Sequence, residues 1–266
     1  MKADRAQALA QARHARIIRG MWQVTTIQLG YPGKSTHHGG LGWSTIGLAR
    51  GAGRLVLLDT GGIPARRIIN REFAAQGIAT TDITDVLITH LHHDHMINWP
   101  MFARATIHAP RADMEWALAQ PDGSETVTET AVRALQACPR LRLFEAGDEV
   151  LPGIASAEYP GHTLHHVAFT LAGSPPTIFS ADIAKNRVEL ATGEADMTMD
   201  ATAHKASIAR LRAAWAAVPG TVLMPGHDVP MVLVDGRPTP QGKLAAGITA
   251  WFGDDLSQTT YFDLTS

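Results

Sequence analysis

The amino-acid sequence predicts an α/β fold in which two β-sheets pack together and are flanked by helices. Short apolar segments typical of strands alternate with amphipathic segments typical of helices, and this order runs twice along the chain. Several strand segments are continuous apolar runs, such as 55–58, which is the pattern of a strand buried on both faces. A chain of 266 residues is long enough to bury a large core of this kind.

The first half of the chain carries strand-like segments interrupted by helical ones. A Gly-rich loop at 32–42 separates the first two strands. The helical spacing at 63–78 is carried by Ile63, Arg67, Ile68 and Phe73, and Gly77 marks the end of this helix. Strands are predicted at 22–31, 42–50, 54–62, 84–90 and 103–110. Helices are predicted at 63–78, 111–119 and 126–138.

The second half repeats this alternation. Residues 200–220 predict a helix, because Ile208, Leu211 and Trp215 fall on one face and Gly220 follows. Strands are predicted at 154–160, 166–173, 176–182 and 221–228, the last being the final buried strand that we expect. Residues 1–20 predict a short N-terminal surface helix, with a mitochondrial transit segment as the alternative, and residues 241–266 form a C-terminal extension.

Composition and charge narrow the classes of function. The net charge is −2 with His neutral and no run of five like charges occurs, so no nucleic-acid partner is expected. No apolar run reaches the roughly 18 residues of a membrane span, so no membrane partner is expected. Cys138 is the single cysteine, which excludes an internal disulfide and makes a reducing, cytoplasmic location the default. Any metal site must therefore use His and carboxylate side chains.

A cluster of histidines follows the strand predicted at 84–90. The stretch THLHHDHMINW begins at residue 89, in a chain with 13 His. His90 and His92 are two positions apart, so in an extended chain both side chains project to one face and can share a metal. Asp94 and His95 follow where the chain leaves the strand, which predicts a second metal beside the first. His93 is out of phase and is expected to be a bystander.

Three later strand ends add further candidate ligands. YPGHT at 159–163 and MPGHD at 224–228 each place a Pro-Gly turn before a histidine, and SAD ends another strand with an aspartate. A Gly at such a point permits a tight turn and a close backbone approach, and rigid strand ends can preorganise ligands. A structural role would account for any one of these residues, but the set together predicts a metal centre. The candidate ligands are His90, His92, Asp94, His95, His162, Asp182 and His227.

The motifs HLHHDH, PGHT, SAD and PGHD, in this order, resemble the metallo-β-lactamase superfamily over about residues 23–228. The resemblance implies an αββα sandwich of two mixed β-sheets flanked by helices, as a single hydrolase domain over 1–266. Asp59, in LLDTGG, matches the family's buried aspartate, which orients a metal ligand. The ligand assignment that the resemblance implies is His90, His92 and His162 for the first metal, Asp94, His95 and His227 for the second, and Asp182 as the bridge.

Such a ligand set predicts hydrolysis. Two divalent ions about 3.5–4 Å apart can hold a bridging hydroxide and polarise a carbonyl or phosphoryl oxygen. Asp94 is expected to bond the hydroxide and carry its proton to the leaving group. Ligation by His and carboxylate suits two zinc ions, with iron or manganese as alternatives. The expected partner is a small-molecule substrate, with an anionic substrate and a homodimer both allowed.

Within the superfamily the layout is most similar to the lactonase branch, which includes N-acyl-homoserine lactonases and pyridoxolactonase. The predicted reaction is therefore the opening of a small cyclic ester or amide. The chain departs from the homoserine lactonases at two places: MINW replaces Gly-Gly-Asn after the histidine motif, and Lys185 replaces a Tyr three residues after the bridging aspartate.

Other activities on the same fold remain as alternatives. A β-lactam hydrolase is one, because the offset of Lys185 resembles the carboxylate-binding Lys of one β-lactamase class. A phosphodiesterase or nuclease is another, because Asn98 and Phe102 resemble a nuclease-like branch. The complete ligand set argues against a mononuclear iron oxygenase and against a non-catalytic binding protein.

Substrate contacts are expected at the mouth of the site. The loop between the first two strands is expected to overhang the metals, with a mobile solvent loop as the alternative. Lys185 is expected to dock a substrate anion or to stabilise the developing oxyanion, with a solvated surface lysine as the alternative. The candidate contacts in the loop and on the facing side are Tyr31, His37, His38, Trp43 and Trp99.

Overall fold

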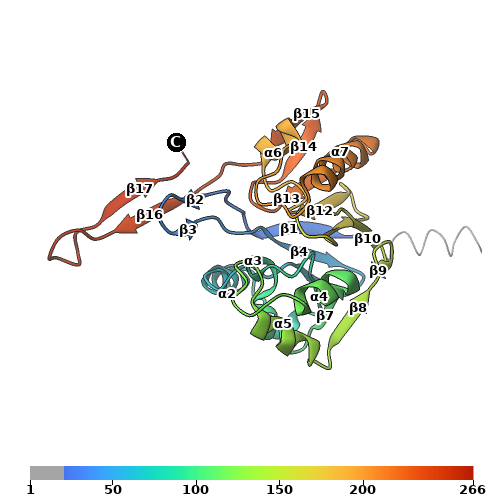
Figure 1. The fold of residues 1–266 in the computed structure, drawn as a ribbon, viewed down its shortest axis with the longest axis horizontal. Helices are drawn as coiled ribbons and strands as arrows, with labels where there is room; N and C mark the ends of the chain where they lie inside the picture. The colour runs from blue at the N-terminus through green and yellow to red at the C-terminus, as the bar shows by residue number, and fades with distance from the viewer. Residues whose placement is uncertain (1–20, 266) are drawn as a thin grey trace, which may run out of the picture.

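The computed structural model describes residues 21–265, which form four layers in the order helices, sheet, sheet, helices, with one hairpin projecting from them (Figure 1). The predicted αββα sandwich is confirmed. The helix expected at 1–20 lies outside the described residues. None of the helices in the described part of the chain has the length and apolar character needed to cross a bilayer.

The first sheet has six strands in the order β1-β4-β5-β6-β7-β8. β1 and β4 pair antiparallel, as do β4 and β5, and the pairs from β5 to β8 are parallel. β8 was absent from the sequence prediction. The strands are β1 (Gln23–Gln28), β4 (Ile46–Gly51), β5 (Arg54–Leu58), β6 (Asp85–Leu87), β7 (Thr106–Pro110) and β8 (Leu141–Phe144).

The second sheet has seven strands in the order β15-β14-β13-β12-β11-β10-β9. β12 and β13 are parallel and the other pairs are antiparallel, so β10, β12 and β13 all end at the same edge. This edge carries the Pro-Gly-His loops. The strands are β9 (Glu149–Leu151), β10 (Ile154–Glu158), β11 (Val167–Leu171), β12 (Thr177–Ala181), β13 (Val222–Pro225), β14 (Met231–Val234) and β15 (Arg237–Pro240).

Helices cover the outer face of each sheet (Figure 1). Against the first sheet lie α2 (Ala65–Ala75), α3 (His93–Met96), α4 (Arg111–Leu118) and α5 (Glu129–Gln136). Against the second lie α6 (Arg187–Thr192) and α7 (Ala201–Ala217). α7 buries the predicted face of Ile208, Leu211 and Trp215. The helix expected at 63–78 is confirmed as α2, and Phe73 is buried on it with Ala65 and Ile69, whereas Ile63 precedes the helix and is 59% exposed.

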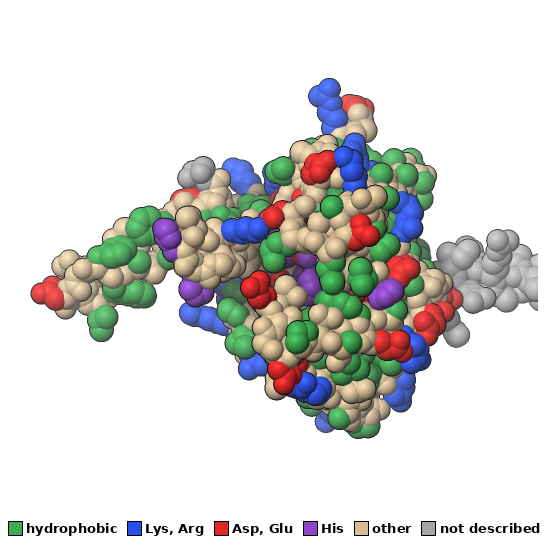
Figure 2. Space-filling view, viewed as in Figure 1, with side chains coloured by type: hydrophobic (Ala, Val, Ile, Leu, Met, Phe, Trp, Pro, Cys, Tyr) green, Lys and Arg blue, Asp and Glu red, His purple; other side chains and the backbone are tan. Residues whose placement is uncertain are grey.

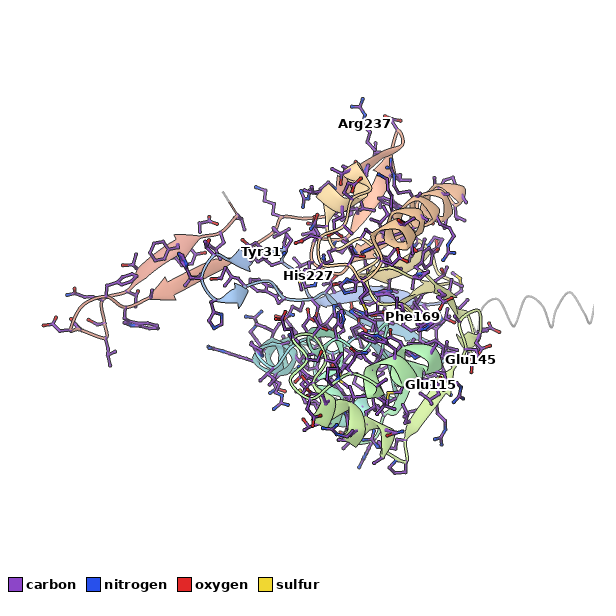
Figure 3. The ribbon with its side chains drawn as sticks, viewed as in Figure 1. Tyr31, Glu115, Glu145, Phe169, His227 and Arg237 are labelled. Carbon is purple, nitrogen blue, oxygen red and sulfur yellow. The ribbon has the colours of Figure 1, made fainter. Side chains whose placement is uncertain are left out.

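Alternating side chains of the central strands separate three hydrophobic clusters, one between each pair of layers. In β5, Leu55 and Leu57 face α2, whereas Val56 and Leu58 face the second sheet. Both faces of the strand are therefore buried, as its continuous apolar run predicted. β11 does the same in the second sheet, because Phe169 (Figure 3) points to the first sheet and its neighbour Ala168 points to α7.

The chain beyond β13 forms more structure than the sequence predicted. β14 and β15 extend the second sheet beyond the predicted last buried strand, and most of their residues are partly or fully exposed. β16 (Gly247–Ala250) and β17 (Thr260–Asp263) form a separate hairpin that projects from the body (Figure 1). Its aromatic residues, such as Phe252, are exposed, and hydrophobic side chains are visible along it in Figure 2. A second small hairpin, β2 (Lys34–Ser35) and β3 (Gly39–Gly40), lies in the Gly-rich loop.

Candidate metal centre

The histidine cluster lies where β6 gives way to α3. β6 ends at Leu87, so His90 and His92 lie in the loop that follows, and Asp94 and His95 lie in the single turn of α3. The His95 ring nevertheless packs against the His90 ring, with centroids 4.2 Å apart. His93 is exposed, in agreement with its expected role as a bystander.

The second sheet contributes the other candidates from three strand ends. His162 lies in the loop after β10, Asp182 directly after β12, and His227 directly after β13. Parallel pairing of β12 and β13 brings Asp182 and His227 together, and the N–H of Gly226 donates to the carbonyl of Ala181 at 2.8 Å.

The glycines of the two Pro-Gly-His loops make these approaches possible. A Cβ on Gly226 would collide with the Asp182 carboxylate, and a Cβ on Gly161 would collide with the backbone of His204. Gly161 also has φ +134°, a conformation that L-residues with side chains rarely adopt. The sequence argument for a close backbone approach at these turns is therefore confirmed at both positions.

The seven predicted residues converge into connected groups. Within each group the candidate ligand atoms lie within 4.8 Å of one another. Asp182 lies at the centre, 3.3 Å from the Nε2 atoms of His95, His162 and His227. The groups are His90, His92 and His162; Asp94, His95 and His227; and His90, His95 and Asp182. The first two match the predicted sets for two metals, and the third joins them through the predicted bridge.

The nitrogen chemistry of the site fits a cation. Nδ1 of His162 lies 3.0 Å from the carbonyl of Met197, and Nδ1 of His227 lies 3.3 Å from the carbonyl of Tyr31. Because a carbonyl can only accept, each Nδ1 carries the proton and each Nε2 offers a lone pair to the centre. Nε2 of His90 is buried without a hydrogen bond, and Nε2 of His95 and Oδ1 of Asp182 are buried 3.3 Å apart without a hydrogen bond of good geometry. Buried polar atoms are rarely left in this state, so a bound metal would satisfy them.

The histidines of the site differ in the direction in which their surroundings shift the imidazole pKa. Burial lowers the pKa of His90 and His162 well below the usual value and lowers the pKa of His92 to about 4, so these three are neutral, as metal ligands must be. Burial also disfavours the charged form of His95, but the carboxylates of Asp94 and Asp182 outweigh it and raise the pKa of His95. A strong positive charge is therefore favoured at this end of the site, where a cation can replace a proton.

Asp59 bonds Thr89 and His95 and so orients one end of the histidine cluster. It is fully buried, and its carboxylate accepts hydrogen bonds from the Thr89 N–H and hydroxyl, each at 2.8 Å. Its Oδ2 also lies 2.7 Å from Nδ1 of His95, which leaves Nε2 of His95 directed to the centre. The structure therefore places Asp59 where the resemblance implied, in contact with a candidate ligand.

The residues predicted to contact substrate differ in their burial and contacts. Tyr31 stacks on Trp43 with ring centroids 4.9 Å apart, and Figure 3 shows Tyr31 next to His227. His37 and His38 are exposed at the tip between β2 and β3. Trp99 corrects the prediction: it is 8% exposed and belongs to the hydrophobic cluster between the first sheet and its helices, so it is a core residue.

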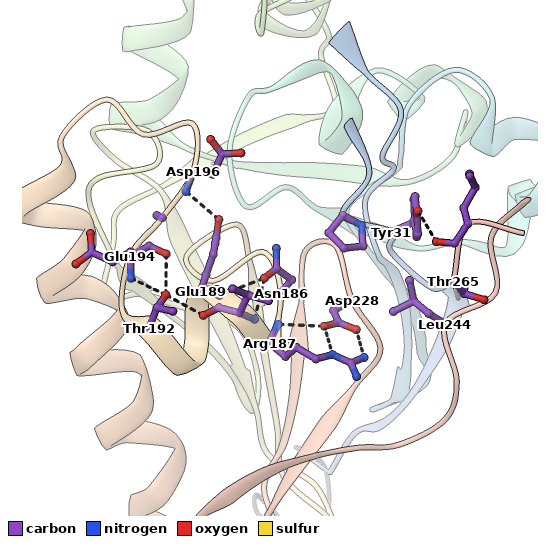
Figure 4. A pocket seen from close by; sticks show the side chains of 14 residues that line it. Tyr31, Asn186, Arg187, Glu189, Thr192, Glu194, Asp196, Asp228, Leu244 and Thr265 are labelled. Carbon is purple, nitrogen blue, oxygen red and sulfur yellow. Dashed lines mark hydrogen bonds and ion pairs between the residues drawn. The ribbon is translucent and has the colours of Figure 1, made fainter. Parts of the chain in front are cut away.

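An open cavity of about 890 Å³ borders the centre (Figure 4). Tyr31 and Asp228 line it, and they lie next to His227 in space and in sequence. Asp228 is held by Arg187 through two hydrogen bonds of 2.6 and 2.8 Å. None of the seven candidate ligands lines this cavity, so it adjoins the metal centre and does not contain it.

Lys185 also differs from its prediction. Its Nζ contacts the carbonyl of Asp196 and lies 3.4 Å from the Glu189 carboxylate, which is itself buried. The Glu189 carboxylate also accepts the backbone N–H groups of Lys185 and Asp196. The ammonium is therefore paired within the protein, because the chain leaving β12 folds back on α6, and the Lys185 side chain is only 12% exposed.

Two buried residues of the site escaped the sequence analysis. His166 packs on His90 with ring centroids 4.5 Å apart, and its Nε2 accepts the backbone N–H of Asp182 at 3.3 Å. Asp113, on α4, accepts hydrogen bonds from Leu91 and Thr163. The only available signal for His166 was its place four residues after His162 in the same loop, and Asp113 stands in an ordinary amphipathic helix.

The comparisons with known proteins agree with this geometry. The family model of the metallo-beta-lactamase superfamily matches residues 39–227, from the β2–β3 hairpin to the last candidate ligand. No curated protein matches the chain in sequence.

Solved structures share the fold at low sequence identity. A candidate metallo-beta-lactamase from Thermotoga maritima is 19% identical with a TM-score of 0.65, and the match covers 80% of this chain and 100% of that one. AidC, a dizinc quorum-quenching lactonase, is 17% identical with a TM-score of 0.63, over 76% of this chain and 80% of that one. AiiA of B. thuringiensis, solved with N-decanoyl-L-homoserine, is 17% identical with a TM-score of 0.62, over 78% and 93%.

Proposed function

Because this chain belongs to the metallo-beta-lactamase superfamily, we propose that it is a dinuclear metal-dependent hydrolase that opens a small cyclic ester or amide. The observation that carries the proposal is the convergence of two ligand trios on one aspartate, Asp182. A lactone is the favoured substrate class, since lactonases such as AidC and AiiA share the fold.

The candidate ligand groups indicate which residues would hold each ion. His90, His92 and His162 would hold one ion, Asp94, His95 and His227 the other, and Asp182 would lie between them. When bound, two zinc ions would polarise the scissile carbonyl and lower the pKa of a water molecule to about 7, so that no serine or cysteine nucleophile is needed.

Asp94 is proposed to move the proton. Its side chain is 23% exposed, more than that of any other member of the two trios, and its Oδ2 lies 3.5 Å from Nε2 of His227. Without an ion, burial disfavours its ionised form, but protonated His95 and His227 outweigh burial and lower the pKa of Asp94; a bound ion would supply positive charge at the same place. An ionised carboxylate can take a proton from water and return it to the leaving group.

The two residues that suggested a nuclease, Asn98 and Phe102, have structural roles. Asn98 is fully buried, and its amide donates to the carbonyls of Thr60, Gly61 and Gly62, so it closes the turn before α2. Phe102 is fully buried in the hydrophobic core. Both residues are thus committed to packing, and neither is available to a phosphodiester.

The proposed function is tested by a hydrolysis screen with metal-reconstituted protein. We expect turnover of lactones above that of lactams, thioesters and phosphodiesters, with close to two metal ions per chain by elemental analysis. His227→Ala should lose one ion and most of the activity, because both ions act together. The matched control is His93→Ala, which removes an exposed imidazole of the same cluster and should keep both ions and the activity.

Two results would contradict the proposal. A firm value of one ion per chain, unchanged when zinc or manganese is added, would exclude the dinuclear site. Preferential turnover of phosphodiesters or lactams with two ions bound would keep the site and replace the substrate class.

A further inference from the structure

Asp113 on α4 is a buried carboxylate with no partner among the lysines and arginines that the structure describes. Its Oδ2 accepts the backbone N–H of Leu91 at 2.7 Å, and its Oδ1 accepts the hydroxyl of Thr163 at 2.5 Å. Burial raises the pKa of Asp113 to about 6, and these hydrogen bonds and the charge of His165 oppose the rise. The group is thus costly to bury and is held by two donors only.

The positions of the two donors are informative. Leu91 lies between His90 and His92, and Thr163 follows His162. These three histidines form the first of the proposed ligand trios. The loop of Leu91 follows β6 of the first sheet, whereas the loop of Thr163 follows β10 of the second. The Asp113 carboxylate therefore connects a loop of the first sheet to a loop of the second by hydrogen bonds, at the point where the two loops would hold the first metal.

We propose that Asp113 is a positioning residue that fixes the loop of His90 and His92 against the loop of His162, and so sets the geometry of the first metal site. The inference rests on the proposed metal centre and not on the proposed substrate. Asp113 does not touch the candidate ligand atoms and acts through the backbone of Leu91 and the side chain of Thr163. Groups that orient metal ligands in this way typically contribute a factor of about 10–100 in metal affinity.

A competing explanation is that Asp113 only anchors α4. Another buried aspartate supplies the matched control. Asp85 lies at the opposite end of β6 and is 1% exposed, and its carboxylate bonds Arg54 at 2.8 Å and His108 at 2.9 Å. Asp85→Asn should lower stability without a specific effect on the metal, because its partners lie away from the ligand loops.

The experiment is a metal titration of the full chain with zinc against a competing chelator, with Tm recorded for each variant. Leu91 and Thr163 donate to different carboxylate oxygens, and in asparagine an NH2 group replaces one of them, so one of the two present hydrogen bonds loses its acceptor. We expect Asp113→Asn to weaken one of two zinc sites by about tenfold or more and to leave the other within about threefold. Asp85→Asn should leave both sites within about threefold.

A second pair keeps the test decisive if Asp113→Asn does not fold. Thr163→Val removes the hydroxyl and should weaken the same zinc site, whereas Thr163→Ser keeps the hydroxyl and should restore it. Equal zinc affinities for Thr163→Val and Thr163→Ser, or a loss for Asp113→Asn no larger than that for Asp85→Asn, would overturn the inference. Wild-type protein that binds no zinc would overturn it together with the metal centre, whereas a failure to hydrolyse lactones would leave it standing.

Discussion

At the residue scale, the function of a charged side chain here depends on what it meets across the fold. Lys185 follows the proposed bridging Asp182 by three residues, yet its ammonium pairs with Glu189, whose side chain is only 5% exposed. The ammonium lowers the cost of burying the Glu189 carboxylate, because an unpaired buried charge is costly. Neighbouring Arg187 is likewise held by Asp228. The cations nearest the centre therefore stabilise α6 and the loop after it.

Lys185→Met keeps the stem of the side chain and removes the charge, which leaves Glu189 without its ammonium. We expect the free energy of unfolding to fall by about 1–3 kcal/mol, measured by urea titration. The control is Lys205→Met, whose pair with Glu194 is exposed and should cost less than about 1 kcal/mol. The value of kcat/KM should change equally for anionic and neutral substrates. A loss confined to anionic substrates would instead give Lys185 a docking role.

At the scale of elements, the turns after the strands position the candidate metal ligands as much as the strands themselves do. The Pro-Gly-His loops after β10 and β13 place His162 and His227 at one edge of the second sheet, because both strands end there. The glycine in each loop leaves space that another part of the centre fills: the carboxylate of Asp182 at Gly226 and the backbone of His204 at Gly161. The conformation of each turn and the position of the candidate ligands therefore depend on each other through packing.

Gly226→Ala tests this coupling. The added methyl would meet Asp182 and the backbone of Ala181, so the bridge must shift. We expect a loss of at least one metal ion and a fall in stability of about 1–3 kcal/mol, the usual cost of overpacking. Gly40→Ala is the control, because its Cβ would meet nothing within 4 Å. Full metal content and unchanged Tm in Gly226→Ala would show that the loop can relax without moving the bridge.

At the scale of the molecule, the metal centre joins the two halves of the sandwich. His90, His92, Asp94 and His95 come from the first sheet, and His162, Asp182 and His227 come from the second. Without a cation, Nε2 of His90, Nε2 of His95 and Oδ1 of Asp182 are buried at the centre without a hydrogen bond of good geometry. A ligand bound only by the native state raises stability through mass action, so the proposed ions should stabilise the whole fold.

Chelation is therefore expected to lower Tm of the whole domain, and re-addition of zinc should restore it. At a free metal concentration about 1,000 times Kd, the stabilisation should be about 4 kcal/mol. Calorimetry of wild-type protein with and without chelator measures it, and His162→Ala should respond less because one trio is incomplete. A wild-type Tm that is indifferent to chelator would show that metal binding and folding are not coupled.

The sequence by itself determined the fold class and the members of the candidate centre. His90 and His92 share a short spacing, and His162, Asp182 and His227 each follow an apolar strand, so local patterns were sufficient to single them out. The buried faces of β5 and α7 were predictable for the same reason, since periodicity is a local property. β8 was missed, because it pairs with β7, a strand more distant in the chain. β14 was missed although it pairs with its neighbours β13 and β15, because a four-residue strand carries a weak local pattern.

Only the tertiary structure decided how the remaining polar residues are used. Trp99 lies in the core, Lys185 pairs with Glu189, and Asp113 reaches two loops from different sheets. The outcomes for Trp99 and Asp113 depend on contacts between segments distant in the chain, whereas Lys185 and Glu189 are four residues apart and their pairing depends on how the chain folds after β12. The physical reason is that burial and pairing set the energy of a charged or aromatic side chain, and both are properties of the packed layers and not of the residues beside it in sequence.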